Sequence, residues 1–252
     1  MGDIINIWKR IGETPLQATQ RAKKDYNISL TPSCFTGRLD PMAQGTMVVL
    51  FGEAVSKQDY YNLCDKTYSF QAILGISTDT YDPMGSIIDV QEITLPQVLK
   101  FNTEMLQFKG KITQHFPPYS AYRFKGHPLW WHARNGSLPS PMPCKERVIY
   151  SVKQITRPVC LSVATYRKTA IADMKDVSSY NGDKFNCSKY IRDWQDLDSS
   201  IQVWRVQYQI KVSSGTYIRS IVHTLGQRLG VPAHAARITR VGCTAPDQVP
   251  DG

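Results

Sequence analysis

The chain has 252 residues, of which 42% are hydrophobic, and this composition is that of a globular protein rather than a disordered one. Lysine and arginine number 30 against 21 aspartate and glutamate, and the formal net charge of +9 favours a polyanionic partner, most simply nucleic acid. No apolar run approaches the roughly 18 residues of a membrane span, and the N-terminus lacks the basic start and apolar core of a signal peptide.

The N-terminal quarter is predicted to contain two strands with helices beside them. Residues 4–8 and 47–51 read as strands, and the second is a continuous apolar run typical of a buried strand. Thr14 followed by Pro15 is a typical start of a helix. A second helix is expected over about 53–64.

The rest of the chain alternates between strand and helix patterns. Residues 68–74 alternate as a strand does, and residues 95–106 follow a Thr-Leu-Pro helix start. A strand over 201–212 leads through a turn into a helix that begins near Tyr217 and ends at Gly230.

The six cysteines are scattered, and none forms a C-x-x-C pair. A zinc ribbon is therefore not expected. The scatter suits a reducing, intracellular compartment. We expect the cytoplasm, with an organelle or the nucleus left open.

A loop with one carboxylate precedes the buried strand. Residues 35–45 read F-T-G-R-L-D-P-M-A-Q-G, which places Asp40 between two glycines. Pro41 disfavours helical geometry at Asp40, and a carboxylate on an irregular segment beside a rigid strand is well placed for chemistry. An isolated Asp-Pro pair is more often a simple turn, so the other motifs must decide between the two interpretations.

Four ordered motifs resemble those of the TruB family of tRNA pseudouridine synthases. Together with a similar closing segment they cover nearly all of the chain except a stretch near 160–200. The matching segments are G-R-L-D-P-M-A-Q-G at 37–45 with G-E-A after the strand, Tyr68 with L-G-I-S-T-D-T-Y-D-P-M-G at 74–85, residues 110–126, S-G-T-Y-I-R at 214–219, and residues 233–242.

The resemblance implies an activity that needs neither a cofactor nor a metal. The enzyme would isomerise one uridine of an RNA to pseudouridine, and family likeness points to the T-loop uridine of tRNA. Asp40 would be the nucleophile, Arg219 would orient it, and Tyr68 would stack on the base and help to remove the C5 proton. Tyr217 and Ile238 would line the pocket.

Three further residues are substrate-binding candidates by the same resemblance. Phe35 stands where the family commonly has a histidine that fills the gap left by the flipped base. Lys9 falls in the family's Lys-Pro-x-Gly element, and Arg123 replaces a lysine, which keeps the charge but not its geometry. These departures leave the identity of the target RNA open.

The implied fold is a single α/β (α+β) catalytic domain over 1–252, with a mixed, largely antiparallel sheet, flanking helices and a central RNA-binding cleft. Residues 160–200 are polar, show no clean period and match the family poorly, so we expect an insertion or an extended loop there. Many family members continue into a small C-terminal RNA-binding domain, for which we see no room before Gly252. The expected partner is RNA, with no membrane; protein partners are open.

The residues alone give one reason to pair Arg219 with an anion. Arg219 falls in the first turn of a predicted helix, where the helix dipole disfavours a cation by a few tenths to about 1 kcal/mol. A nearby anion, such as Asp40 or a phosphate, would remove this conflict.

Two other functions stay open at this point. An RNA chaperone or ribonucleoprotein component could use the cleft only to grip RNA, and it would tolerate the Asp40→Asn substitution. A glycosidase-like hydrolase could use Asp40 with Asp79 or Asp82, and it would release free uracil, which pseudouridine formation does not.

Overall fold

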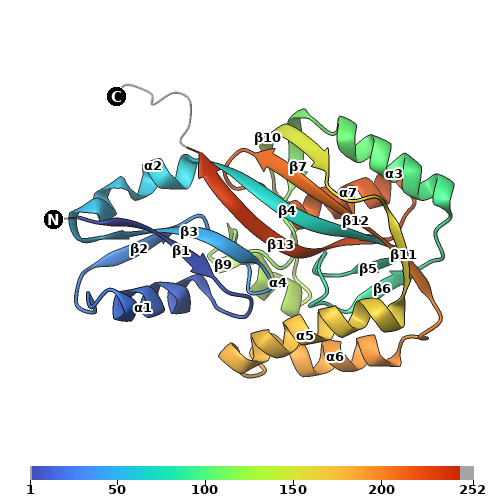
Figure 1. The fold of residues 1–252 in the computed structure, drawn as a ribbon, viewed down its shortest axis with the longest axis horizontal. Coiled ribbons are helices and arrows are strands. Elements are labelled where there is room, and N and C mark those ends of the chain that lie inside the picture. The colour runs from blue at the N-terminus through green and yellow to red at the C-terminus, as the bar shows by residue number, and fades with distance from the viewer. Residues whose placement is uncertain (1, 245–252) are drawn as a thin grey trace.

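A nine-stranded sheet forms the centre of the computed structural model, which describes residues 2–244 (Figure 1). Its strands are, in chain order, β1 (Ile4–Lys9), β2 (Ser33–Thr36), β3 (Gln44–Phe51), β4 (Asp65–Leu74), β7 (Gly110–His115), β10 (Cys144–Gln154), β11 (Val159–Ser162), β12 (Gln202–Val212) and β13 (Ala233–Thr244). Seven of them follow the order β1-β3-β13-β4-β12-β10-β7, while β2 pairs with β3 and β11 with β12. The expectation about the chain's end at Gly252 lies outside the described residues.

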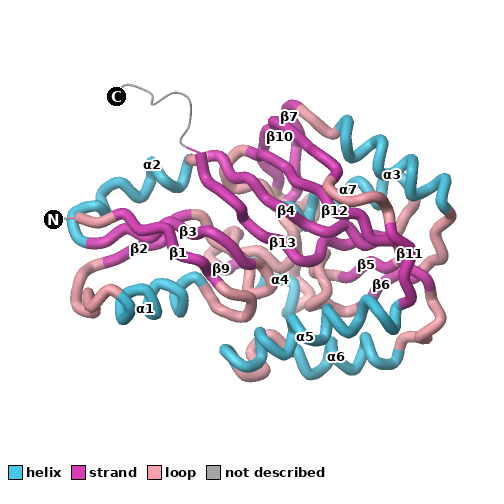
Figure 2. Tube along the Cα trace, in the orientation of Figure 1, coloured by secondary structure: helices cyan, strands magenta, loops and turns pink. Residues whose placement is uncertain are grey.

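The strand pairs of this sheet are antiparallel with one exception. β13 and β3 run parallel where Thr239 faces Gln44 and Arg240 faces Gly45. The prediction of a mixed, largely antiparallel sheet is therefore confirmed (Figure 2).

Seven α-helices and two short hairpins surround the sheet in the described part of the chain. The helices are α1 (Pro15–Asp25), α2 (Gln58–Leu63), α3 (Leu95–Gln107), α4 (Leu129–Arg134), α5 (Val163–Asn181), α6 (Cys187–Asp196) and α7 (Ile218–Leu229). The hairpins are β5 (Ile76–Thr78) with β6 (Ile87–Val90), and β8 (Arg123–Phe124) with β9 (His127–Pro128). None of the helices within residues 2–244 has the length and apolar character that crossing a membrane requires.

Helices cover both faces of the central strands (Figure 1). Phe70, Ala72 and Leu74 of β4 belong to the core formed with α3 and α7. Ile73 points the other way, into a second core formed with α5 and α6. This alternation is the one predicted for residues 68–74, because successive side chains of a strand face opposite sides.

Most of the predicted elements are confirmed within a residue or two. Thr14 caps α1, where its hydroxyl oxygen accepts from the backbone N–H of Gln17 at 3.2 Å. Gly230 follows α7 in the left-handed region, with φ of 65°. The helix expected over 53–64 is instead a 3-10 helix, Gly52–Lys57, followed by the six-residue α2. Only Ala54 of that 3-10 segment is buried, so little packing favours a continuous α-helix.

Residues 160–200 were expected to form either an insertion or an extended loop, and they do not form an extended loop. The helices α5 and α6 form a hairpin there, called the α5–α6 hairpin below (residues 163–196). Its first helix has buried residues at helical spacing: Val163, Tyr166, Ala170, Asp173, Met174 and Val177. The period was obscured because a charged residue, Asp173, sits in this buried stripe, where its carboxylate pairs with Arg237 at 2.9 Å.

Candidate active site

Asp40 lies in a tight loop between β2 and β3. Leu39 and Met42 are buried in the two cores on either side, which fixes the loop around the carboxylate. The backbone N–H of Ala43 donates to the carbonyl oxygen of Asp40 at 3.0 Å and closes the turn. The Asp40 side chain remains 40% exposed, so its carboxylate is accessible to a ligand.

Lys9 supports this loop and is not among the residues that line the cleft beside Asp40. Its buried ammonium group donates to the carbonyl oxygens of Ala43 at 2.6 Å and of Arg10 at 3.1 Å. Burial lowers the pKa of Lys9 to about 8, although Asp40 and Glu13 act in the opposite direction. The structure therefore gives Lys9 a supporting position rather than the predicted contact with substrate.

Gly45 lets β3 approach β13 closely at the end of the loop. Its φ is +120°, and a Cβ at this position would collide with the backbone carbonyl oxygen of Arg240. The close approach places the Arg240 guanidinium beneath the loop, where it donates to the carbonyl oxygens of Thr46 at 2.6 Å and Gly37 at 2.8 Å.

Asp40 forms an ion pair with Arg219 of α7. The distance from Arg219 Nη2 to Asp40 Oδ2 is 2.8 Å, and Nη1 donates to the carbonyl oxygen of Thr80 at 2.7 Å. Burial alone would lower the pKa of Arg219, but Asp40 and Asp82 outweigh it and raise that pKa. The predicted anion beside the first turn of this helix is present, and it is Asp40.

A second carboxylate, Asp82, shares the same guanidinium at 3.5 Å. It is buried, and its Oδ1 accepts from both the Thr80 hydroxyl and the Met84 N–H, each at 2.9 Å, while its Oδ2 faces Arg219. Burial raises the pKa of Asp82 to about 6, with Arg219 opposing this shift. The oxygens of Asp82 are thus occupied by protein groups inside the protein. Asp40, which is 40% exposed, is the carboxylate that a ligand can reach.

Five of the predicted site residues line one cleft of about 380 Å³, called the Asp40 cleft below. They come from segments far apart in the sequence: Asp40, Tyr68, Tyr217, Arg219 and Ile238. The cleft lies within the size range of about 300–1,000 Å³ usual for ligand sites. Burial raises the pKa of Tyr68, so its phenol keeps its proton at neutral pH.

Phe35 is not among the residues that line this cleft. It is paired with Val49 in the register of β2 and β3, and directly paired residues share one face of a sheet. On that face it packs against the small core of β1, β3 and α1, which also includes Met47 and Val49. The strand register therefore turns the predicted stacking residue toward the protein interior.

Arg123 lies beside the cleft rather than in it. It is exposed on β8, where its guanidinium donates to the carbonyl oxygen of Gly126 at 3.0 Å. It lines an adjoining hollow of about 560 Å³ whose other lining residues include Arg38 and Tyr217, which also line the Asp40 cleft. This position suits contact with a substrate that extends beyond the cleft.

Two buried cations of the cleft, Lys66 and Arg240, were not among the predicted site residues. Lys66 donates to the carbonyl oxygen of Asn62 at 2.7 Å and to the Ser214 hydroxyl at 3.2 Å. Burial lowers the pKa of Lys66 to about 8. The burial of Lys66 could have been predicted from the alternation of the strand. Lys66 is two residues before Tyr68, so the two side chains lie on the same face of β4.

Replacing Lys66 with Met is expected to change how stability depends on pH. The unfolded lysine keeps its proton up to its ordinary pKa of 10.5, whereas folded Lys66 loses it near 8. Between these values the unfolded state binds more protons, so Lys66 makes wild-type stability rise with pH, by at most about 1.4 kcal/mol for each pH unit. Urea unfolding at roughly pH 7 and pH 9.5 measures the slope, which should be smaller in the variant. The exposed Lys57→Met control should keep the wild-type slope, and an unchanged slope in Lys66→Met would refute this explanation.

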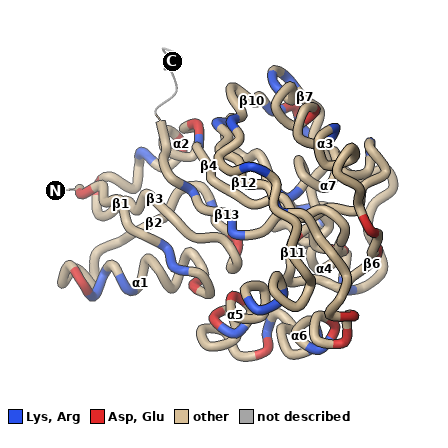
Figure 3. Tube along the Cα trace, turned by 45° about the vertical axis from the view of Figure 1, so that its right-hand side comes forward, with Lys and Arg blue, Asp and Glu red and all other residues tan. Residues whose placement is uncertain are grey.

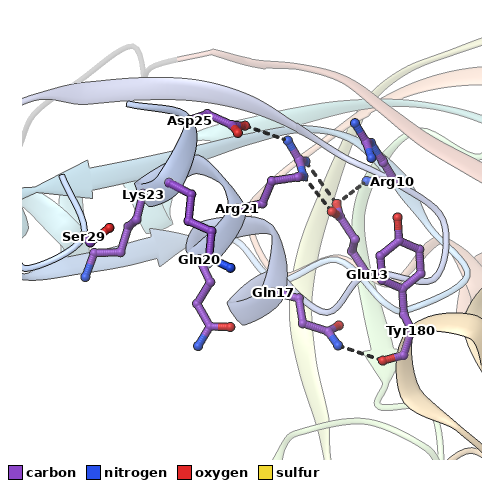
Figure 4. Close-up of a pocket in the computed structure, with 10 residues that line it drawn as sticks. Arg10, Glu13, Gln17, Gln20, Arg21, Lys23, Asp25, Ser29 and Tyr180 are labelled. Atoms are coloured by element: carbon purple, nitrogen blue, oxygen red, sulfur yellow. Dashed lines mark hydrogen bonds and ion pairs between the residues drawn. The ribbon is translucent and has the colours of Figure 1, made fainter. Parts of the chain in front are cut away.

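A larger open hollow of about 700 Å³ runs along α1 (Figure 4). In it the carboxylate of Glu13 accepts from the guanidinium of Arg21 at 2.7 Å and from the backbone N–H of Arg10 at 2.9 Å. No residue that lines this hollow also lines the Asp40 cleft. Both carboxylates that line this hollow, Glu13 and Asp25, pair with Arg21. The hollow contains none of the predicted site residues, five of which line the Asp40 cleft.

Comparison with known proteins identifies a family to which most of the chain matches. Residues 23–165 match the family described as TruB family pseudouridylate synthase, N-terminal domain, and this match covers more than half of the chain. The chain belongs to the TruB family. The matched residues include Asp40 and Tyr68, while Arg219 lies beyond them.

Curated members of the TruB family align with almost the whole chain. The tRNA pseudouridine synthase B of Idiomarina loihiensis is 27% identical over 237 residues, which are 94% of this chain and 61% of that protein. The tRNA pseudouridine synthase B of Protochlamydia amoebophila is 31% identical over 238 residues, 94% of this chain and 72% of that protein. The chain thus spans about three fifths of the length of the first of these relatives.

Solved structures of similar fold include a Cbf5-Nop10-Gar1 complex, with a TM-score of 0.56, 19% identity and coverage of 95% of this chain and 48% of that chain. An H/ACA RNP bound to a substrate RNA containing 2′-deoxyuridine gives a TM-score of 0.53 at 17% identity, covering 97% and 49%. These likenesses confirm the predicted fold.

Proposed function

We propose that this TruB family protein isomerises a uridine of RNA to pseudouridine, with tRNA as the substrate. The observation that carries the proposal is the Asp40–Arg219 ion pair of 2.8 Å in the wall of a cleft that also presents Tyr68, Tyr217 and Ile238. The name shared by the bacterial relatives, tRNA pseudouridine synthase B, supports the same activity.

The reaction requires a nucleophile and proton transfers but no change of oxidation state. The N1–C1′ bond breaks, the base turns within the pocket, C5 bonds to C1′, C5 loses its proton and N1 gains one. A carboxylate can form the transient covalent bond, either to C1′ or to the pyrimidine ring. Asp40 takes this role, and Arg219 holds its carboxylate in position through a charge-assisted pair.

The aromatic residues of the cleft receive the base. A uridine must leave its stack to reach Asp40, at a cost of a few kcal/mol, and stacking in the cleft offsets that cost. Tyr68 stacks on the base as a neutral phenol, because burial raises its pKa. Its hydroxyl oxygen takes up the C5 proton as it gives up its own proton to water, so the phenol ends neutral. Tyr217 and Ile238 close the remaining sides.

RNA is the partner that the charge distribution favours. Figure 3 shows lysine and arginine spread over most elements, with acidic residues interspersed on α5 and α6. Arg38, at the mouth of the Asp40 cleft, and Arg123, in the adjoining hollow, are both exposed. Such residues bind phosphates without reading sequence.

Two further proposals concern context. The protein acts in the cytoplasm, since all six cysteines are free thiols, as a reducing compartment favours.

Residues 1–252 act as one catalytic domain, in which the α5–α6 hairpin is an addition to the family pattern.

The experiment that tests the function uses a tRNA transcript carrying tritium at C5 of its uridines. Wild-type protein is expected to release tritium to solvent and to release no free uracil, because the base stays attached to the RNA. Free uracil would instead indicate a hydrolase that uses Asp40. Tight RNA binding without tritium release would indicate an RNA-binding protein.

A further inference from the structure

A second cavity adjoins the Asp40 cleft and shares the Asp40–Arg219 pair with it. It has a volume of about 440 Å³, called the hairpin cavity below, and Asp40, Arg219 and Arg38 line both it and the Asp40 cleft. Its far wall belongs to the α5–α6 hairpin, from which three side chains line it: Lys184, Phe185 and Tyr190. The hairpin thus helps to line a cavity that also contains the Asp40 carboxylate.

Aromatic rings make up much of the lining. The four aromatic residues are Tyr119, Trp130, Phe185 and Tyr190. Trp130 of α4 is 41% exposed, and the guanidinium carbon of Arg134 lies 5.5 Å from the centre of its ring. Exposed aromatic faces and arginine planes are the surfaces on which unpaired RNA bases stack.

The cavity also carries positive charge that has no carboxylate partner. Within residues 2–244, none of Arg38, Arg134 and Lys184 forms an ion pair with a carboxylate. The two carboxylates that line the cavity, Asp40 and Asp82, are both paired with Arg219. The remaining charge favours a ligand that brings its own anion, such as a phosphate.

The hairpin is fixed to the same residues that hold the nucleophile loop. The Asn181 side-chain amide donates to the carbonyl oxygen of Gly12 at 2.8 Å, and the Gly12 N–H donates to the carbonyl oxygen of Pro41 at 2.9 Å. The indole N–H of Trp194 on α6 donates to the carbonyl oxygen of Pro83 at 2.8 Å. The wall is therefore preformed, which lowers the ordering cost of binding.

We propose that the hairpin cavity binds the nucleotide next to the target uridine, so that the α5–α6 hairpin helps to select the site of modification. The inference rests on the proposed function, because it needs an RNA strand in the Asp40 cleft. A strand that places one base beside Asp40 passes Arg38 at the shared wall and brings its neighbour into the cavity. Phe185 and Trp130 stack on that base, and Arg38 and Lys184 face its phosphates.

The test uses tRNA T-arm stem-loops with 2-aminopurine, a base whose fluorescence falls on stacking, at the position 5′ or 3′ of the target uridine. The RNAs are titrated with Asp40→Asn protein, so that the uridine is not consumed. Fluorescence is expected to fall at one of the two positions. When Lys184→Ala and Phe185→Leu are introduced into the Asp40→Asn protein, most of this fall in fluorescence should disappear. RNA binding should also weaken at least about fivefold. The Phe185→Leu change keeps an apolar contact with the core beneath the hairpin, and the exposed Trp130→Ala offers a second variant.

The matched control is Tyr180→Ala, which removes an exposed aromatic of the same hairpin outside the cavity. It should bind as its parent protein does. Tritium release by wild-type protein is measured in parallel on the same stem-loops. Release without any fluorescence change at either position would overturn the hairpin site and leave the proposed function standing. The absence of both release and binding would overturn both.

Discussion

Replacing Asp40 with Asn is expected to slow tritium release from C5-labelled RNA by at least about a thousandfold, because an amide cannot form the covalent bond that a carboxylate forms. The change preserves shape, and the side chain is 40% exposed, so folding should be little affected. Initial rates measure the effect, and filter retention measures RNA binding. Affinity should stay within about threefold of wild type, since the other contacts of the cleft are kept.

The control for this substitution is Asp89→Asn, which makes the same change at an exposed position of β6. Asp89 lines neither the Asp40 cleft nor the hairpin cavity, so the variant should react at the wild-type rate. If Asp40→Asn retained more than about one tenth of that rate, Asp40 would not be the nucleophile.

Replacing Arg219 with Met should lower stability as well as activity. Arg219 and Asp82 are both buried, and removing the guanidinium leaves the Asp82 carboxylate without its counter-charge. Losing one partner of a buried ion pair typically costs about 3–5 kcal/mol. Asp40 would also lose its orienting partner, so tritium release should fall together with the free energy of unfolding. Chemical unfolding and initial rates measure the two effects.

The stability cost of Arg219→Met should shrink as the pH falls. Burial already raises the pKa of Asp82 to about 6, above its ordinary 3.8, and removing Arg219 raises that pKa further. A carboxyl with a raised pKa is neutral below that value, so the penalty for burying its charge is present at higher pH and relieved in acid.

The double variant Arg219→Met/Asp82→Asn separates the two roles of Arg219. It should regain stability at neutral pH, because the buried charge is gone, but not activity, because Asp40 still lacks its partner. If the double variant also regained activity, Arg219 would not act through Asp40. A stability cost that did not vary with pH would show that Asp82 is not its cause.

The elements that the sequence predicted well are those whose burial repeats with a clear period. β4 and β12 alternate because one face of each enters the core formed with α3 and α7, while the other face carries mainly polar, half-buried residues. α7 presents one apolar stripe to the same core. The meeting of Asp40, Tyr68 and Arg219 in one cleft has no such local signal. It follows from the order of the strands, which periodicity does not determine. The helix dipole indicated only that Arg219 needs an anion nearby, with Asp40 or a phosphate as candidates, and the resemblance to a family brought all three residues together.

The features that the sequence did not predict correctly each have a physical explanation. The α5–α6 hairpin was hidden because buried Asp173 interrupts its apolar stripe. Lys66 and Arg240 were overlooked because a charged residue is usually taken as solvent-facing, whereas backbone carbonyls hold both of them inside. Phe35 and Lys9 were placed by motif alone, which fixes a position in the chain but not the direction of a side chain.

The central claim, that Asp40 isomerises a uridine within RNA, is tested most directly by mapping pseudouridine at single-nucleotide resolution. Unmodified tRNA transcripts and bulk cellular RNA would be incubated with wild-type or Asp40→Asn protein and read by carbodiimide-blocked reverse transcription. We expect a new stop at a specific uridine with the wild-type protein alone, and stops confined to bulk RNA would move the target outside tRNA. If wild-type protein gave no new stop in either RNA and still bound RNA tightly, the claim would be contradicted and the protein would be an RNA-binding protein.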